Sequence, residues 1–182
     1  AVLLAAKHPV LSINGNTASL AAAEIADLQK ASGAQVEVNL FHRTEERLKK
    51  VNAVLEEAGC VVNRGKVERC VPLPHDRGLC CPDGIGSADV VLVPLEDGDR
   101  CEALVGMGKI VITVDLNPID RTSKMATLPI VDEVRRALPN IAAECRRLKA
   151  EGKAVEMPDI DNRAILRASI NDIKEFLDNA LD

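Results

Sequence analysis

Short apolar runs and longer stretches of helical periodicity alternate along this chain of 182 residues. The apolar runs, several of them rich in Val and Ile, predict strands at residues 9–13, 35–41, 60–63, 89–94, 109–116 and 125–131. Apolar positions three to four residues apart predict helices at 18–33, 44–59, 99–108, 132–152 and 161–181. Because runs such as 90–93 are apolar at every position, we expect an α/β fold in three layers, with a mostly parallel sheet and helices on both faces.

Two of the predicted helices carry residues that typically start or stop a helix. Thr44 is a candidate N-cap, and Glu45 and Glu46 follow it in the first turn, where negative charge is favourable. Gly33 and Gly59 are candidate stops. Pro139, which lacks a backbone N–H, is expected to begin a second segment within the helical stretch 132–152.

Two stretches depart from the regular alternation. Residues 63–88 contain three prolines and several glycines, which predicts a long irregular connection, either functional or disordered. At the other end, residues 158–182 carry an apolar stripe at helical spacing and are expected to dock on the domain or on a partner subunit. The stripe consists of Ile165, Leu166, Ile170, Ile173, Phe176, Leu177 and Leu181. We expect residues 1–182 to form a single domain.

Composition narrows the classes of function. The net charge of −5 gives no overall attraction to nucleic acid or to an anionic membrane, and two Phe without Tyr or Trp leave few platforms for stacking bases. The apolar runs are too short to span a bilayer. Six cysteines in a chain of this size indicate the reducing cytoplasm. Zinc at Cys70, His75, Cys80 and Cys81 is disfavoured, since adjacent cysteines rarely share one ion, and we expect no zinc-binding residues.

Polar side chains follow four of the predicted strands. In chain order they are Asn14, Asn16, Asn39, His42, Arg43, Arg47, Glu96, Asp97, Asp99, Arg100, Asp115, Asn117 and Arg121. Each group has a local alternative, a turn or a helix cap, but Asp115 directly follows a buried strand and needs a partner. Because the carboxyl ends of parallel strands meet at one edge of a sheet, we expect one shared site there.

The residue types at this edge suit an anionic ligand. Arginines recognise phosphate and carboxylate groups, and Asp97, Asp99 and Asp115 could contribute to an Mg²⁺ site. Together they indicate phosphoryl or nucleotidyl chemistry. The chain has no phosphate-binding loop of the G-x-x-x-x-G-K-[ST] type, and Gly84-Ile85-Gly86 precedes a strand rather than following one. A nucleotide would therefore be bound by an unusual route.

Four segments resemble a known family. "SINGN", "VEVNLFHRTEER", "SADVVLVPLEDGDRCEALVGMGK" and "VITVDLNPIDRT" are similar, in this order and within residues 8–145, to the archaeal-type 4-phosphopantoate–β-alanine ligase, or phosphopantothenate synthetase. The resemblance implies a Rossmann-like fold and a homodimer. It also implies the synthesis of 4′-phosphopantothenate for coenzyme A from 4-phosphopantoate, β-alanine and ATP, with release of AMP and diphosphate.

The resemblance also implies which residues bind the nucleotide. These are Asp115, Leu116, Asn117, Arg121 and Thr122, followed by Glu133 and Val134, where the match departs at Glu133. The family has a helical segment ahead of the position where this chain begins, and that segment supplies further arginines.

We predict the roles of the other polar residues that follow the strands from the chemistry of their side chains. Arg43, Arg47 and Arg100 are expected to bind the phosphate and carboxylate of phosphopantoate or to neutralise the α-phosphate. Asp97 or Asp99 is expected to hold Mg²⁺ or the β-alanine ammonium group, while the side chains that orient the substrate are Asn14, Asn16, Asn39 and His42. The alternatives are a non-catalytic sensor that binds a nucleotide or coenzyme A, and a purely structural domain.

Overall fold

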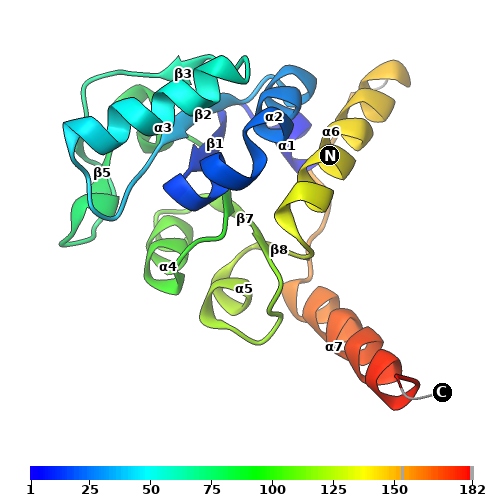
Figure 1. Cartoon of the computed structure of the whole chain (residues 1–182). Helices are drawn as coiled ribbons and strands as arrows, with labels where there is room; N and C mark the ends of the chain where they lie inside the picture. The colour runs from blue at the N-terminus through cyan, green and yellow to red at the C-terminus, as the bar shows by residue number, and fades with distance from the viewer. Residues whose placement is uncertain (153, 181–182) are drawn as a thin grey trace.

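Six parallel strands form the central sheet of the computed structural model, which describes residues 1–152 and 154–180 (Figure 1). In spatial order they are β3 (Val62–Asn63), β2 (Gln35–Val38), β1 (Pro9–Ile13), β6 (Val90–Pro94), β7 (Ile110–Asp115) and β8 (Leu128–Val131). Val10 pairs with Gln35 on one side and with Val91 on the other, so β1 is an interior strand. The predicted parallel sheet is confirmed.

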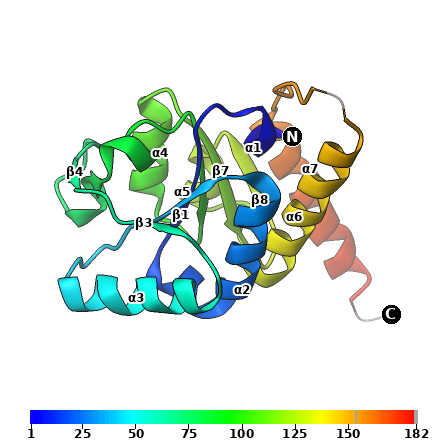
Figure 2. The ribbon, with the colours of Figure 1, turned by 90° about the horizontal axis from the view of Figure 1, so that it is seen from above.

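Helices cover both faces of this sheet, which confirms the three-layer prediction. One face carries α2 (Gly15–Ser32), α3 (Glu45–Glu57) and α6 (Val134–Ala150), which lie side by side in Figure 2. The other face carries α4 (Gly98–Gly106), α5 (Arg121–Met125) and the irregular stretch after β3. The remaining helices are α1 (Val2–Ala5) and α7 (Asn162–Asp178).

The core is divided by the sheet into two apolar clusters. On the α2 side, Ile25, Leu55 and Leu138 come from three different helices and pack on the strands. On the α4 side, Ile85 and Leu104 occupy the equivalent layer. Strands buried on both faces explain the uninterrupted apolar run of β6.

Side-chain caps and glycines set the helix boundaries. Thr44 Oγ1 accepts the backbone N–H of Arg47 at the start of α3, as predicted. Gly33 and Gly59, with φ of 82° and 94°, follow α2 and α3 in the left-handed conformation that favours glycine. The sequence predicts that this helix begins at residue 18, but α2 begins at Gly15, because the side chain of Asn14 caps it.

The prediction that Pro139 begins a new helical segment is wrong. Helix α6 runs through Pro139 without interruption. The proline lies one and a half turns from the helix start, so the backbone bond lost is the one to the carbonyl of Arg135. Arg135 is exposed, and water can therefore satisfy that carbonyl.

The stretch 63–88 is an ordered cover over the sheet rather than a disordered loop. It contains the short antiparallel pair β4 (Glu68–Arg69) and β5 (Leu79–Cys80), the 3-10 turn η1 (Asp76–Gly78) and the π-type turn η2 (Pro82–Gly86). Buried Glu37 on β2 accepts the backbone N–H groups of Cys81 and Ile85, each at 2.8 Å. Gly84 passes so close to the Glu37 carboxylate that a Cβ atom would collide with it.

Helix α7 leaves the body of the molecule at its amino end and projects outward (Figure 1). Asn162 Nδ2 anchors it by donating to the carbonyl oxygens of Ser123 and Ala126, at 2.9 and 2.6 Å. Of the predicted stripe, Leu166 is buried, whereas Phe176 is 72% exposed. Leu181 lies outside the described residues. The docking of residues 158–182 stays a prediction.

Two general expectations can be compared with the described residues. No helix among them has the length and apolarity to cross a membrane. All six cysteines, each of which the structure describes, are free thiols.

Candidate active site

The polar strand ends lie on the carboxyl edge of the sheet, where β1 and β6 are neighbours. From β1 the chain continues through α2 to β2 on one side, and from β6 through α4 to β7 on the other side. The two helices also lie on opposite faces of the sheet. A crevice opens at such a point of divergence, which is where open α/β sheets bind ligands.

A hollow of about 320 Å³ lies at this point, and we call it the switch-point hollow. Four residues predicted from the sequence line it: Asn14, Asn16, Arg47 and Asp97. Glu96, expected at this edge from the sequence but given no individual role, also lines it, and the remaining lining residues are Gly15, Leu40, Phe41, Arg77 and Leu95.

Beneath this hollow, two buried arginines share one buried carboxylate. Arg100 Nη1 donates to Glu96 Oε2 at 2.6 Å, and Arg77 Nη2 is ion-paired with Glu96 Oε1. Burial lowers the pKa of Arg77 to about 9 and of Arg100 to about 10, so both are charged at neutral pH. With Arg47 at the rim, three guanidinium groups lie at or beneath a hollow whose lining carboxylates are those of Glu96 and Asp97, which favours an anionic ligand.

Only one of the two buried arginines can reach a ligand in the hollow. Arg100 is 0% exposed, and its Nη2 is also bound to Ser12 Oγ at 2.9 Å. Arg77 lines the hollow. Its Nη1 donates to the carbonyl oxygen of Asn39 at 2.6 Å, and its Nε lies 3.8 Å from Asp97 Oδ2. Arg77 could not be predicted from strand ends, because it lies in the irregular stretch between β3 and β6.

The asparagines predicted to orient substrate are mostly occupied with the backbone. Asn14 Oδ1 caps α2, and its Nδ2 donates to the carbonyl oxygen of Leu95 at 2.9 Å. Buried Asn39 donates to the carbonyl oxygen of Leu79 at 2.9 Å and does not line the hollow. Asn16 is exposed at the rim.

Backbone strain is concentrated at the same place. Leu95, the residue after β6, has a φ of +52°. Its N–H donates to the carbonyl of Val114 and its own carbonyl accepts from Asn14, so neighbours on both sides fix this conformation. Non-glycine residues in this region typically mark functional sites.

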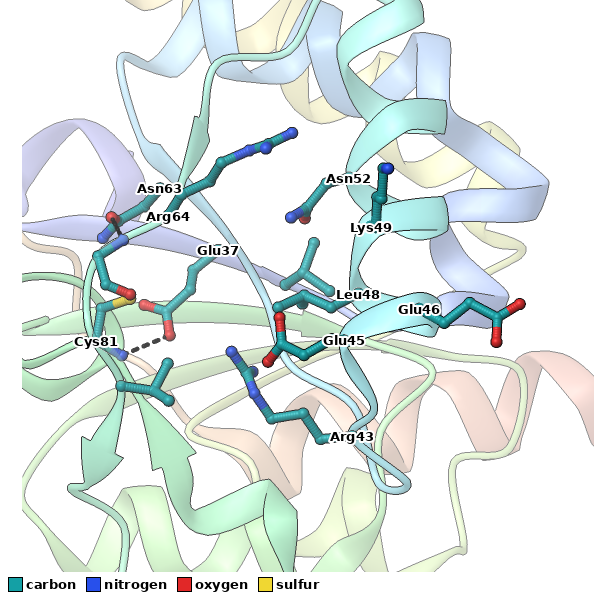
Figure 3. A pocket seen from close by; sticks show the side chains of 13 residues that line it. Glu37, Arg43, Glu45, Glu46, Leu48, Lys49, Asn52, Asn63, Arg64 and Cys81 are labelled. Carbon is teal, nitrogen blue, oxygen red and sulfur yellow. Dashed lines mark hydrogen bonds between the residues drawn. The ribbon is translucent and has the colours of Figure 1, made fainter.

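Besides Asn39 and Arg100, three predicted residues near this edge lie outside the switch-point hollow. His42 is exposed, with its ring edge-on to Phe41. Asp99 is also exposed and ion-paired with Arg121. Arg43 lines a second hollow of about 600 Å³ between α3 and the ends of β2 and β3, which we call the α3 hollow (Figure 3).

The residues that the resemblance assigns to the nucleotide lie together, further along the same edge. Asp115 ends β7 opposite Val131 of β8, and its carbonyl accepts the N–H of Asp132. Its Oδ1 accepts the N–H of Asn117, the residue after exposed Leu116. Beyond β8 and Asp132 come Glu133, the N-cap position of α6, and Val134, which is buried.

Thr122 links this group to the switch-point hollow. It is buried on α5, and its Oγ1 donates to the carbonyl oxygen of Glu96 at 2.9 Å. Arg121 crosses the start of α4, where a Cβ atom on Gly98 would collide with it. The two groups of predicted residues are therefore parts of one continuous edge.

The carboxylates predicted to hold Mg²⁺ do not fit a resident ion. No three His, Cys, Asp or Glu side chains in the described part of the chain form a group that could hold a metal. Asp97 Oδ1 accepts the backbone N–H of Arg100 at 2.8 Å, and Asp99 is engaged with Arg121.

Comparisons with known proteins agree with the resemblance seen in the sequence. The profile of the phosphopantothenate/pantothenate synthetase family matches residues 1–176. A 4-phosphopantoate–β-alanine ligase of Methanospirillum hungatei is 56% identical over 182 residues, which are 100% of this chain and 75% of that protein. The ligase of the same name from Methanosarcina mazei is 49% identical over 97% of this chain and 72% of its own length.

A third relative, from Thermococcus kodakarensis, bears the same name and is 47% identical over 82% of this chain and 58% of its own length. The resemblance first noted within residues 8–145 thus extends over almost the whole sequence. The chain belongs to the phosphopantothenate/pantothenate synthetase family.

Proposed function

We propose that this chain condenses 4-phosphopantoate with β-alanine to 4′-phosphopantothenate, at the expense of ATP, in coenzyme A biosynthesis. That it is a ligase follows from its family and from the names of its relatives. The structural observation that supports the substrates is the switch-point hollow. Its excess of guanidinium groups suits an acid that carries both a carboxylate and a phosphate.

The reaction proceeds in two steps, adenylation of the acid and formation of the amide bond. A carboxylate oxygen of 4-phosphopantoate attacks the α-phosphorus of ATP, the bond to the β-phosphate breaks, and diphosphate leaves. The amine of β-alanine then attacks the acyl carbon, the bond to AMP breaks, and the amine loses a proton. Charge neutralisation by positioned cations is the main contribution a protein makes to such steps.

We assign the contacts with the acid to the side chains that the structure exposes to it. Arg77 and Arg47 bind its anionic groups, and Asn16 lies beside them at the rim. Arg100 and Asn39 are positioning residues, because Arg100 holds Glu96 and Asn39 holds the 77–79 turn.

The nucleotide is proposed to bind where β7 and β8 end. Asp115, Asn117, Arg121 and Thr122 would contact it, with Glu133 and Val134 alongside. Mg²⁺ would arrive bound to the ATP phosphates, since the described residues include no group of three or more His, Cys, Asp or Glu side chains that could hold the ion alone. We further propose a cytoplasmic homodimer in which the exposed stripe of α7 contributes to the interface.

An AMP-release assay tests the proposed reaction. The protein is mixed with ATP, Mg²⁺ and 4-phosphopantoate, with and without β-alanine, and pantoate lacking the phosphate replaces the acid in a parallel series. We expect AMP and 4′-phosphopantothenate in equal amounts only when phosphopantoate and β-alanine are both present. ATP binding without AMP in any mixture would contradict ligation and favour a nucleotide sensor.

The variant Arg47→Met tests whether Arg47 contacts the acid substrate. Arg47 is exposed, so its loss should leave the fold intact while raising KM for 4-phosphopantoate about tenfold, the effect of removing a single charged contact. Arg135→Met, on the exposed side of α6, is the matched control and should retain wild-type values. Equal KM values in the two variants would remove Arg47 from the acid site.

A further inference from the structure

The first turn of α2 forms part of the wall of the switch-point hollow. Asn14, Gly15 and Asn16 all line it. A Cβ atom added at Gly15 would have a single neighbour from outside its own turn within 4 Å, Val51 Cγ2 at 4.0 Å. The backbone at the start of α2 is therefore accessible from the hollow.

Two backbone N–H groups of this turn have no acceptor among the residues that the structure describes. Asn14 takes two others, because its Oδ1 accepts the N–H of Thr17 at 2.9 Å and its carbonyl oxygen accepts that of Ala18 at 3.0 Å. The N–H groups of Gly15 and Asn16 remain, as expected for the first residues of a helix. An anion placed here would accept from both and would be stabilised by the helix dipole.

Two arginines that line the same hollow also have capacity for an anion. Arg77 is only 3% exposed, yet its Nε has no hydrogen-bond acceptor in the described part of the chain, and Asp97 Oδ2 at 3.8 Å is beyond that distance. Arg47 Nη1 donates to the carbonyl oxygen of His42 at 3.0 Å rather than to a carboxylate. Because buried donors are nearly always satisfied, the Arg77 Nε indicates an acceptor supplied by a ligand.

The order of the strands indicates which end of the acid lies against α2. The first turn of α2 follows β1 and Arg47 lies beyond β2, whereas the nucleotide group follows β7 and β8, on the far side of β6. During ligation the carboxylate of the acid must meet the α-phosphorus of ATP, so it points toward β7. The phosphate, at the other end of the same molecule, then lies beside α2.

We propose that the first turn of α2 is the phosphate subsite of the acid. The N–H groups of Gly15 and Asn16 donate to the phosphate oxygens, Arg47 and Arg77 neutralise their charge, and the carboxylate is directed toward Thr122. This orientation rests on the proposed function. It makes the α2 turn the element that distinguishes a phosphorylated acid from an unphosphorylated one, because an acid without the phosphate leaves these donors unpaired.

The variant Gly15→Pro removes one of the two N–H donors. Proline is favoured at the first position of a helix, and Asn14 already has the extended conformation that precedes a proline, with φ of −98° and ψ of 174°. We expect an unchanged or higher Tm, because proline restricts the unfolded chain. KM for 4-phosphopantoate should rise about tenfold, the effect of losing one hydrogen bond to a charged group, while KM for ATP stays within about twofold.

Glu45→Pro is the matched control. Glu45 is the first residue of α3, is exposed, follows the extended Thr44 and does not line the switch-point hollow, so both KM values should stay at the wild-type level. Gly15→Ala adds a carbon atom but keeps the N–H group, and its KM for 4-phosphopantoate should lie well below that of Gly15→Pro. Equal KM values for the two Gly15 variants would attribute the effect to bulk and overturn the proposal.

Calorimetry with two acids tests the orientation without requiring turnover. With and without a non-hydrolysable ATP analogue, the wild-type protein should bind 4-phosphopantoate at least about tenfold more tightly than pantoate, which lacks the phosphate. Gly15→Pro and Arg47→Met should each weaken 4-phosphopantoate about tenfold and pantoate by less than about twofold. Equal losses for both acids would place the carboxylate at α2 and overturn the proposal.

The same titrations distinguish this inference from the proposed ligation. If the wild-type protein forms no product, binding that depends on the phosphate and is weakened in the variants still supports the subsite, although ligation fails. If the wild-type protein forms product but binds both acids equally, ligation stands and the subsite is overturned. No heat from either acid with the wild-type protein also overturns it. Should Gly15→Pro fail to fold, Arg47→Met carries the comparison, because Arg47 is exposed.

Discussion

Glu96 is the residue on which the switch-point hollow depends. Its two carboxylate oxygens hold Arg77 and Arg100 separately, and its carbonyl accepts from Thr122 of the nucleotide group. A buried ion pair adds little to stability relative to apolar side chains, but removing one partner leaves an unbalanced buried charge. Removing the charge of Glu96 would leave two unbalanced buried charges, those of Arg77 and Arg100.

Glu96→Gln is therefore expected to lower the free energy of unfolding by about 3 kcal/mol, measured by urea titration. Glu102→Gln is the matched control, because Glu102 makes its ion pair with Arg121 at the surface. Exposed pairs contribute little, so this variant should unfold at the wild-type urea concentration. Equal effects of the two substitutions on the free energy of unfolding would contradict a larger contribution from the buried Glu96 pairs.

The buried carboxyl group of Glu37 is expected to make the free energy of unfolding depend on pH. Burial raises the pKa of this carboxyl group above its ordinary value of 4.5, although two backbone N–H groups oppose the rise. The folded chain then holds the proton more tightly than the unfolded chain. Stability from Glu37 is present below pH 4.5 and is lost as the pH rises through the folded-state pKa.

Glu37→Gln cannot titrate and should lack this loss. We expect the difference in free energy of unfolding between wild type and Glu37→Gln to shrink from pH 4.5 to pH 7, measured by urea titration at both values. A difference that is constant, or that grows toward pH 7, would contradict the raised pKa.

Residue positions along the edge were predictable, but the directions of the side chains were not. Asn14, Asn16, Arg47 and Asp97 follow strands, and the parallel sheet brings them to one hollow. Arg100 also follows a strand, yet one turn of α4 directs it under the sheet edge to Glu96 and Ser12. The position of a residue after a strand predicts that it lies at the carboxyl edge of the sheet. Whether its side chain points into the hollow or beneath it depends on long-range packing.

At the scale of the elements, the helix caps and the strand order explain most of the agreement with the sequence. Local signals such as Thr44 and Gly59 act within one turn and could be read directly. Helix α6 differs, because its continuity through Pro139 is maintained by tertiary packing of Leu138 and Ala142, which are buried against the sheet. Propensity alone cannot anticipate that contribution.

Pro139→Ala tests this explanation. Alanine restores the backbone N–H and the bond to the Arg135 carbonyl, so we expect the free energy of unfolding to rise by about 1–2 kcal/mol. Part of the helical gain is offset by the greater freedom of the unfolded chain. The measurement is a urea titration followed by circular dichroism. A destabilised variant would show that the fixed φ of proline is needed at this position.

At the scale of the whole molecule, most of α7 extends beyond the residues against which the described part of the chain packs it. Its amino end is held by Asn162 and Leu166, while Ile173, Phe176 and Leu177 are exposed beyond the body (Figure 1). An exposed apolar stripe of this kind is typical of an interface.

Light scattering tests the predicted homodimer. The wild-type protein at about 10 µM is expected to have twice the chain mass of 19.5 kDa. Phe176→Ser combined with Leu177→Ser should reduce the mass toward that of one chain, because burial of these two side chains would stabilise the dimer. Lys174→Ser is the control on the same helix. A monomeric wild type, or a dimeric double variant, would exclude α7 from the interface.

The sheet order has a consequence for synthesis on the ribosome. Strand β1 leaves the ribosome early, but its neighbour β6 follows about 80 residues later, and Asn14 reaches its acceptor at Leu95 only when both are present. Contacts so distant in sequence form late in folding. The link from the hollow to Thr122 cannot exist in a nascent chain that stops short of α5. The growing polypeptide therefore cannot join the acid site to the nucleotide site before about two thirds of the chain has been made.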